Sequence, residues 1–103
     1  MYSYNDRQNK NNPIWDNTTR CVSVPLTGAD QTLTGPILFG NPYYIIISNV
    51  GANNVWVSPN AIAGPGNGIL IPPGATFETA FGENAALHVW GTNLQAISLV
   101  LYG

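Results

Sequence analysis

Residues 43–58, with the sequence YYIIISNVGANNVWVS, contain two short apolar runs separated by a polar break that includes a glycine. Tyrosine, isoleucine, valine and tryptophan are typical of β-strands, and the Asn-Val-Gly-Ala-Asn break is typical of a tight turn. In the second run Val55 and Val57 alternate with Trp56, which is the two-residue period of a strand with one buried face. This stretch therefore predicts a strand, a turn and a second strand.

The same pattern of short apolar runs, divided by glycine, proline and asparagine, continues over residues 20–103. No part of this region keeps an apolar period of 3.6 residues over three turns, so we expect no helix of consequence. Strands that recur every 8–12 residues or so predict an all-β fold, a compact antiparallel β-sandwich or jelly-roll-like domain. The predicted strands span residues 20–24, 31–34, 43–48, 54–58, 68–71, 75–81, 86–90 and 94–102.

Residues 1–19 differ in composition and are predicted to form an extended polar N-terminal arm, with residues 20–103 as the β-sandwich domain. Such a segment buries too little apolar surface to offset its own ordering entropy, so we expect another chain to hold it. The alternative is that the arm lies along its own domain. The predicted partner-binding residues of the arm are Tyr2, Tyr4, Arg7, Lys10 and Trp15.

The chain carries few charges, because only 8% of its 103 residues are Asp, Glu, Lys or Arg, against roughly 25% in an average soluble domain. All three basic residues fall within the first twenty positions. The body therefore lacks the basic cluster that binding to nucleic acid or to an anionic membrane surface requires, and no run of about 18 apolar residues could span a membrane. A low surface charge favours a protein that is permanently assembled with other chains.

The residues that could carry catalysis are few. His88 is the only histidine, and after residue 20 the carboxylates are Asp30, Glu78 and Glu83. A serine, His88 and Asp30 could form a triad in space, but no Gly-x-Ser-x-Gly turn supports it, so a structural histidine is the favoured interpretation. Glu78 and Glu83 are expected to be a solvated pair, and Cys21 a small core residue. We expect no enzyme, no metal site and no cofactor.

Strand alternation places Trp56, His88 and Trp90 on the nominally outer face of the sandwich. The run at residues 43–47 is apolar on both faces, as expected for a strand covered on both sides. A small sandwich has only one inner layer, so a partner subunit or a ligand is expected to cover these residues. Sugars stack on exposed aromatic rings, but this body has few charged groups for sugar hydroxyls, and aromatic residues are enriched at protein interfaces. We therefore favour an oligomer interface over a glycan site.

Two segments, ISNVGANNVWVS at residues 47–58 and GILIPPGATFE at residues 68–78, carry a family resemblance. With the Leu-Val-Leu of residues 99–101, they resemble small β-domain structural proteins of tailed bacteriophages, of the head decoration or cement type. The first twenty residues have no counterpart in that pattern.

The resemblance implies a virion protein on the capsid surface, a homotrimer that stabilises the head by clamping neighbouring major capsid subunits. No apolar signal segment is evident at the N-terminus, so synthesis in the host cytoplasm is expected. The alternative is a phage tail, baseplate or fibre component, or a carbohydrate-binding module that uses Trp56 or Trp90.

Overall fold

The computed structural model describes residues 19–33, 44–80 and 86–103. Residues 1–18 of the predicted arm lie outside the described residues, and with them its anchors Tyr2, Tyr4, Arg7, Lys10 and Trp15, as does Glu83. Within the described residues each predicted strand is present, with ends within two residues of the prediction. The strands are β1 (Arg20–Pro25), β2 (Gln31–Leu33), β3 (Tyr44–Asn49), β4 (Val55–Pro59), β5 (Ile69–Ile71), β6 (Thr76–Ala80), β7 (Leu87–Trp90) and β8 (Ala96–Tyr102).

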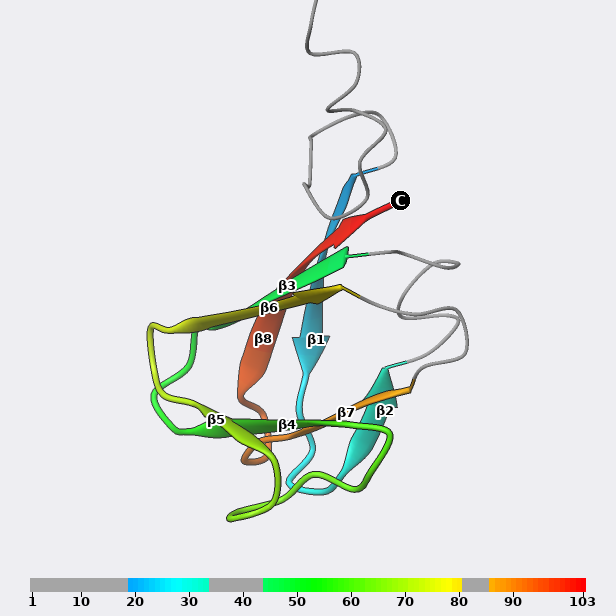
Figure 1. Ribbon diagram of the computed structural model, residues 1–103. Coiled ribbons are helices and arrows are strands. Elements are labelled where there is room, and N and C mark those ends of the chain that lie inside the picture. Colours follow the sequence, from blue (N-terminus) through cyan, green and yellow to red (C-terminus); the bar gives the residue numbers. More distant parts are fainter. Residues whose placement is uncertain (1–18, 34–43, 81–85) are drawn as a thin grey trace, which may run out of the picture.

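The strands form two four-stranded antiparallel sheets that pack as a sandwich, which confirms the predicted fold class (Figure 1). Sheet A has the order β1-β8-β3-β6, and sheet B has the order β2-β7-β4-β5. The chain passes from one sheet to the other at every connection except that between β4 and β5. This interleaving, with the first strand beside the last, is the strand order of an eight-stranded jelly roll.

The core lies between the sheets and is built by alternation along each strand. Ile45 and Ile47 of β3, and Val55 and Val57 of β4, are fully buried. Their outward neighbours, such as Ile46, are half-buried. Each fully buried Val, Leu or Ile contributes about 1.5–3 kcal/mol. A single inner layer of aliphatic side chains therefore holds the two sheets together.

The prediction that Cys21 is a core residue is wrong. Val22 and Val24 of β1 face the core, so alternation turns Cys21 outward, where it is exposed. The apolar run had suggested burial, but the direction of a side chain is decided by the register of its strand.

One glycine of the long loop between β4 and β5 is required by close approach. Gly68 has a φ of 111°, a conformation that favours glycine, and a Cβ there would collide with the backbone carbonyl of Val57. At the tip of this loop Gly64 and Asn67 exchange two backbone hydrogen bonds. The loop is therefore a defined hairpin that folds back against β4. No helix within the described ranges is long and apolar enough to cross a membrane.

Candidate functional site

The outer face of sheet B carries two tryptophans on neighbouring strands. Trp56 on β4 is the register partner of Trp90 on β7, and on its other side Trp56 pairs with Leu70 of β5. Both tryptophans are half-buried and point outward, as the alternation predicts. Their role as an oligomer interface or a glycan site stays a prediction. We call this surface the tryptophan face and define it by Thr32, Trp56, Ser58, Leu70, His88 and Trp90.

One end of the tryptophan face is tied to two loops through His88. Its Nδ1 lies 2.9 Å from Asp30 Oδ2, and Asp30 lies in the connection between β1 and β2. Asp30 Oδ1 accepts a 2.9 Å hydrogen bond from the backbone N–H of Ala63 in the long loop. Ala63 is only 2% exposed, and the outward-pointing Ser58 only 9%. The tryptophan face is therefore closed at this end.

The same contacts set the charge state of Asp30. Partial burial raises the pKa of the Asp30 carboxyl, but the Ala63 N–H and His88 lower it by more. The pKa of Asp30 therefore lies below its ordinary value of 3.8. The carboxylate holds the loop as a charged acceptor at neutral pH.

A histidine paired with an aspartate is one part of the catalytic triad of serine hydrolases. Whether His88 and Asp30 could act in this way depends on the position of a nucleophile. Such an enzyme needs a hydroxyl hydrogen-bonded to the imidazole nitrogen that the acid leaves free. Ser58 is the register partner of His88, but within the described residues no hydrogen bond joins them. The Thr32 hydroxyl lies 3.5 Å from Nδ1, the nitrogen that Asp30 already holds. In this part of the chain His88 and Asp30 act as a tether between β7 and two loops.

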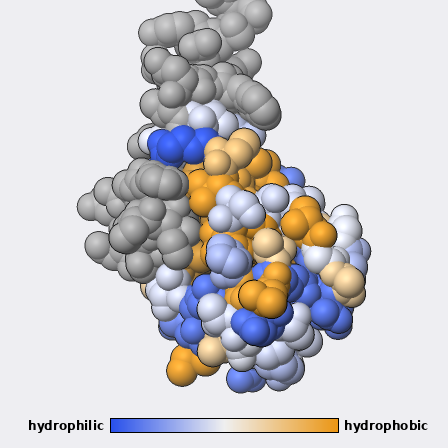
Figure 2. Space-filling view, turned by 180° about the vertical axis from the view of Figure 1, so that it is seen from behind, coloured by the Kyte–Doolittle hydropathy of each residue, from blue (hydrophilic) through white to orange (hydrophobic). Residues whose placement is uncertain are grey.

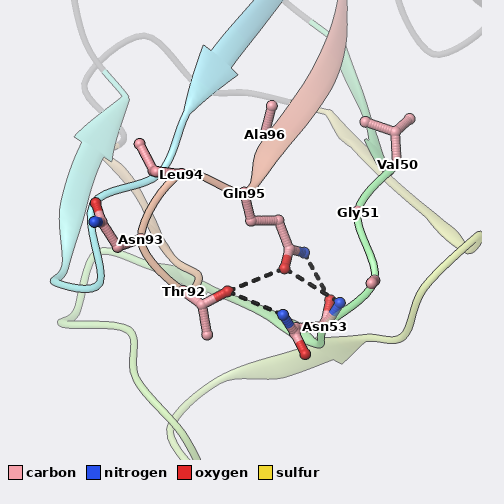
Figure 3. A pocket seen from close by; sticks show the side chains of 9 residues that line it. Val50, Gly51, Asn53, Thr92, Asn93, Leu94, Gln95 and Ala96 are labelled. Carbon is pink, nitrogen blue, oxygen red and sulfur yellow. Dashed lines mark hydrogen bonds between the residues drawn. The ribbon is translucent and has the colours of Figure 1, made fainter.

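A second polar cluster lies at the other end of sheet B, where the β3–β4 turn meets the loop between β7 and β8. It lines a depression of about 350 Å³ (Figure 3). Figure 3 shows the Gln95 side chain reaching across to Asn53 and Thr92. Gly51 leaves the space for it, because a Cβ at that position would overlap the Gln95 side chain. We call this group the amide cluster and define it by Asn49, Gly51, Asn53, Thr92 and Gln95.

The two buried amides of this cluster are saturated with hydrogen bonds. Asn49 Nδ2 donates to the carbonyls of Asn53 and Ile71, both at 2.8 Å, and Asn49 Oδ1 accepts from Gly51 N–H at 3.0 Å and from Gln95 Nε2 at 2.9 Å. Gln95 Nε2 also donates to the Asn53 carbonyl at 2.6 Å, and Gln95 Oε1 accepts from Asn53 N–H and from Thr92 Oγ1, both at 3.2 Å. An amide offers two donors and two acceptor positions, and all are used. The cluster therefore joins the two sheets, and its two buried amides have no polar capacity left for a ligand.

The outer face of sheet A has a different character. The register places four hydroxyl side chains in one row across all four strands, and a mostly apolar row lies two residues away on each strand. We call this surface the hydroxyl face. Its hydroxyl row is Ser23, Ser98, Ser48 and Thr76, and its second row is Cys21, Val100, Ile46 and Glu78.

Glu78, at the edge of sheet A, is the one charged residue that the described registers place on the hydroxyl face. Its carboxylate accepts a 2.7 Å hydrogen bond from the Tyr44 hydroxyl. This bond raises the pKa of Tyr44 above its ordinary value.

A shallow depression of about 400 Å³ runs between β1 and β8 on this sheet. In Figure 2 apolar residues gather in the upper part of the molecule, the level of sheet A in Figure 1, and most strongly hydrophilic residues lie below.

The chemistry available in the described residues is limited. They contain no group of three or more His, Cys, Asp and Glu side chains that could hold a metal ion. Their charged residues are Arg20, Asp30 and Glu78, besides the titratable His88.

The structure brings the sequence-predicted residues Trp56, His88 and Trp90 together on one face. Sequence reasoning missed the hydroxyl row and the amide cluster. The serines of the row give no local signal, since their alignment depends on the register of four strands. The amide cluster had one usable signal, the Asn49–Asn53 turn, but its partner Gln95 lies more than forty residues away.

Comparison with known protein families, curated proteins and solved structures finds no match to the chain.

Proposed function

We propose that the protein is a structural subunit of a virion, a capsid decoration protein that self-associates and stabilises the head shell by clamping major capsid subunits. The observation that carries the proposal is the poverty of charge on both outer faces of the sandwich. Asp30 is bound to His88, and Glu78 to Tyr44, so neither carboxylate is left to solvent alone. Burying such a surface against another chain desolvates few charged groups, and the desolvation of charge is what makes burial costly.

The jelly roll supports this proposal only in a general way. The architecture occurs in viral capsid domains, and also in lectins and cupins, so the fold by itself does not decide the function. The polar arm, with Tyr2, Tyr4, Arg7, Lys10 and Trp15 as anchors, adds a second contact that could fold on its capsid partner. The body is then the self-associating part and the arm the capsid-binding part.

The test combines light scattering with co-sedimentation. The full chain should have a mass above that of one 11.0 kDa chain and should pellet with empty capsids assembled from the major capsid protein of the same virus. Changing Tyr2, Tyr4 and Trp15 together to Ala should abolish pelleting and leave the oligomer intact. A monomer at every concentration contradicts self-association, and an oligomer that never pellets contradicts decoration.

A second candidate function is glycan binding, and the tryptophan face favours it. Trp56 and Trp90 offer adjacent aromatic surfaces, and the exposed Thr32 and the half-buried His88 supply polar groups beside them. A glycan array separates the candidates. Binding that Trp56→Ala abolishes without changing the oligomer would support a tail, baseplate or fibre component that recognises a host glycan. An array without any signal would contradict it.

A further inference from the structure

Self-association requires a surface that is complementary to itself, and the two outer faces of the sandwich differ in this respect. The tryptophan face is closed at one end by the loop that Asp30 and Ala63 hold. The hydroxyl face carries small side chains in its central row, so it is shallow and allows two sheets to approach to about 10 Å. Away from the end that carries Tyr44 and Tyr102, the two rows of the hydroxyl face have the shape for close sheet-on-sheet packing.

The chemistry of the hydroxyl row is also self-complementary. A hydroxyl group both donates and accepts hydrogen bonds, so a row of serines can pair with an identical row, whereas a row of lysines or carboxylates would repel its own copy. Ser98 and Ser48 on the two central strands are register partners, with Ser23 and Thr76 at the edges. The adjacent Val100 and Ile46 supply apolar contact.

We propose that the hydroxyl face packs against the hydroxyl face of a second copy of this chain, around a twofold axis that runs along the strands. The inference rests on the self-association in the proposed function and names the surface that performs it. This axis places each hydroxyl row on its copy and each apolar row on its copy. It also sets the two Glu78 side chains at opposite edges of the pair, so they do not repel each other.

The axis fixes which strands meet across the interface. Because it reverses the strand order of the second sheet, Ser98 on β8 faces Ser48 of the second copy, and Ser23 on β1 faces Thr76 of the second copy. Within one chain Ser23 and Thr76 lie on opposite edge strands of sheet A, too far apart to contact each other. A charge pair between these two positions can therefore form only between two chains.

The size of the face sets the expected strength of the pair. Four strands about 4.8 Å apart, with β8 seven residues long, give a face of about 20 Å by 20 Å. A standard stable interface buries about 800 Å² of accessible surface on each partner. The area of this face, taken as flat, is smaller than that. The pair is therefore a weak dimer whose population depends on concentration. It leaves the tryptophan face and the arm free for other partners.

The experiment uses two double variants of the full chain that differ only in the sign of the charge introduced at Ser23. Ser23→Glu with Thr76→Glu puts like charges across the interface twice and should weaken association at least about tenfold. Ser23→Lys with Thr76→Glu puts opposite charges there and should restore or strengthen it. Both positions are exposed, so neither change disturbs the core. The measurement is mass against concentration by light scattering, with circular dichroism as the check on folding.

The matched control places the same charges on the tryptophan face. Thr32→Glu with Leu70→Glu changes the two edge strands of sheet B at exposed positions and should leave the mass unchanged. A second readout is alkylation of the exposed Cys21, which should slow as the wild-type concentration rises and should not slow in the like-charge variant.

The outcomes separate this inference from the proposed function. A wild-type monomer at every concentration overturns both. A wild-type oligomer that survives the like-charge variant, or that dissociates with the control variant, overturns the hydroxyl-face inference alone. A trimer by mass overturns the twofold arrangement and supports the oligomer that the family resemblance implies.

Discussion

Two polar clusters hold loops at opposite ends of the sandwich, and they do so by different chemistry. The amide cluster is neutral, and its buried members Asn49 and Gln95 are 1% and 8% exposed. The cluster of Asp30, His88 and Ala63 is charged and partly open to solvent, since the Asp30 side chain is 24% exposed. A saturated neutral network is strong and independent of pH, whereas an open ionic one is weaker and can be titrated.

The largest effect is expected from Asn49→Ala. This change removes four hydrogen bonds, and in a buried site it takes one of two acceptors from Gln95 Nε2 and the side-chain donor from the Ile71 carbonyl. We expect the free energy of unfolding to fall by about 3 kcal/mol, measured by urea denaturation. Asn53→Ala is the matched control, because its exposed side chain makes a single 3.3 Å bond to Thr92 and its loss should cost less than about 1 kcal/mol. Equal losses in the two variants would contradict the buried network.

A smaller effect is expected from Gly51→Ala. The added methyl group overlaps the Gln95 side chain, which must leave its hydrogen-bonded position or push the turn outward. We expect a loss of about 2 kcal/mol, within the range of over-packed sites. Gly64→Ala is the control, because nothing lies near its Cβ and its φ is not positive. The melting temperatures of the two variants check the prediction, which fails if both are unchanged.

The smallest effect at neutral pH is expected from Asp30→Asn. The change keeps the shape of the side chain and removes its charge, so the hydrogen bonds to Ala63 and His88 weaken. We expect a loss of about 1 kcal/mol after allowance for solvent screening. The measurement is the free energy of unfolding of wild type and of Asp30→Asn, compared by urea denaturation at pH 7.

The pH dependence of this site distinguishes the two clusters. Because the folded state lowers the pKa of Asp30, its stabilisation is fully present above the ordinary value of 3.8 and is lost as the pH falls through the lowered folded value. The difference in unfolding free energy between wild type and Asp30→Asn should therefore shrink in acid. The difference between wild type and Asn49→Ala should stay constant over the same range. An Asp30→Asn difference that does not change with pH would contradict the carboxylate tether.

Local sequence patterns predicted the strands and the faces on which most side chains lie. Val55, Trp56 and Val57 show why, since the alternation of buried and outward-facing side chains follows directly from the order of the residues. Cys21 was misplaced because it was assigned from the apolar run as a whole, although the polar Ser23 two residues later shares its face. The partners of Asp30 and of Asn49 depend on contacts between distant segments, which no local pattern records.

The hydroxyl row shows the same limit on a larger scale. Four residues on four strands become neighbours only after three register choices have been made. A single shift by one residue in any of them would turn one side chain of the row into the core. The candidate surface for self-association could therefore be described only from the assembled sheet.

The interleaved strand order also governs how the chain reaches this structure. Sheet A joins the first strand to the last, since β1 lies beside β8, and neither sheet can be completed from one half of the chain. Folding must close loops of high sequence separation before most contacts form, so it is expected to be slow and to be completed only after β8 has left the ribosome. Until then the half-made sheets expose unpaired edges, and the low charge of the chain offers them little protection from aggregation.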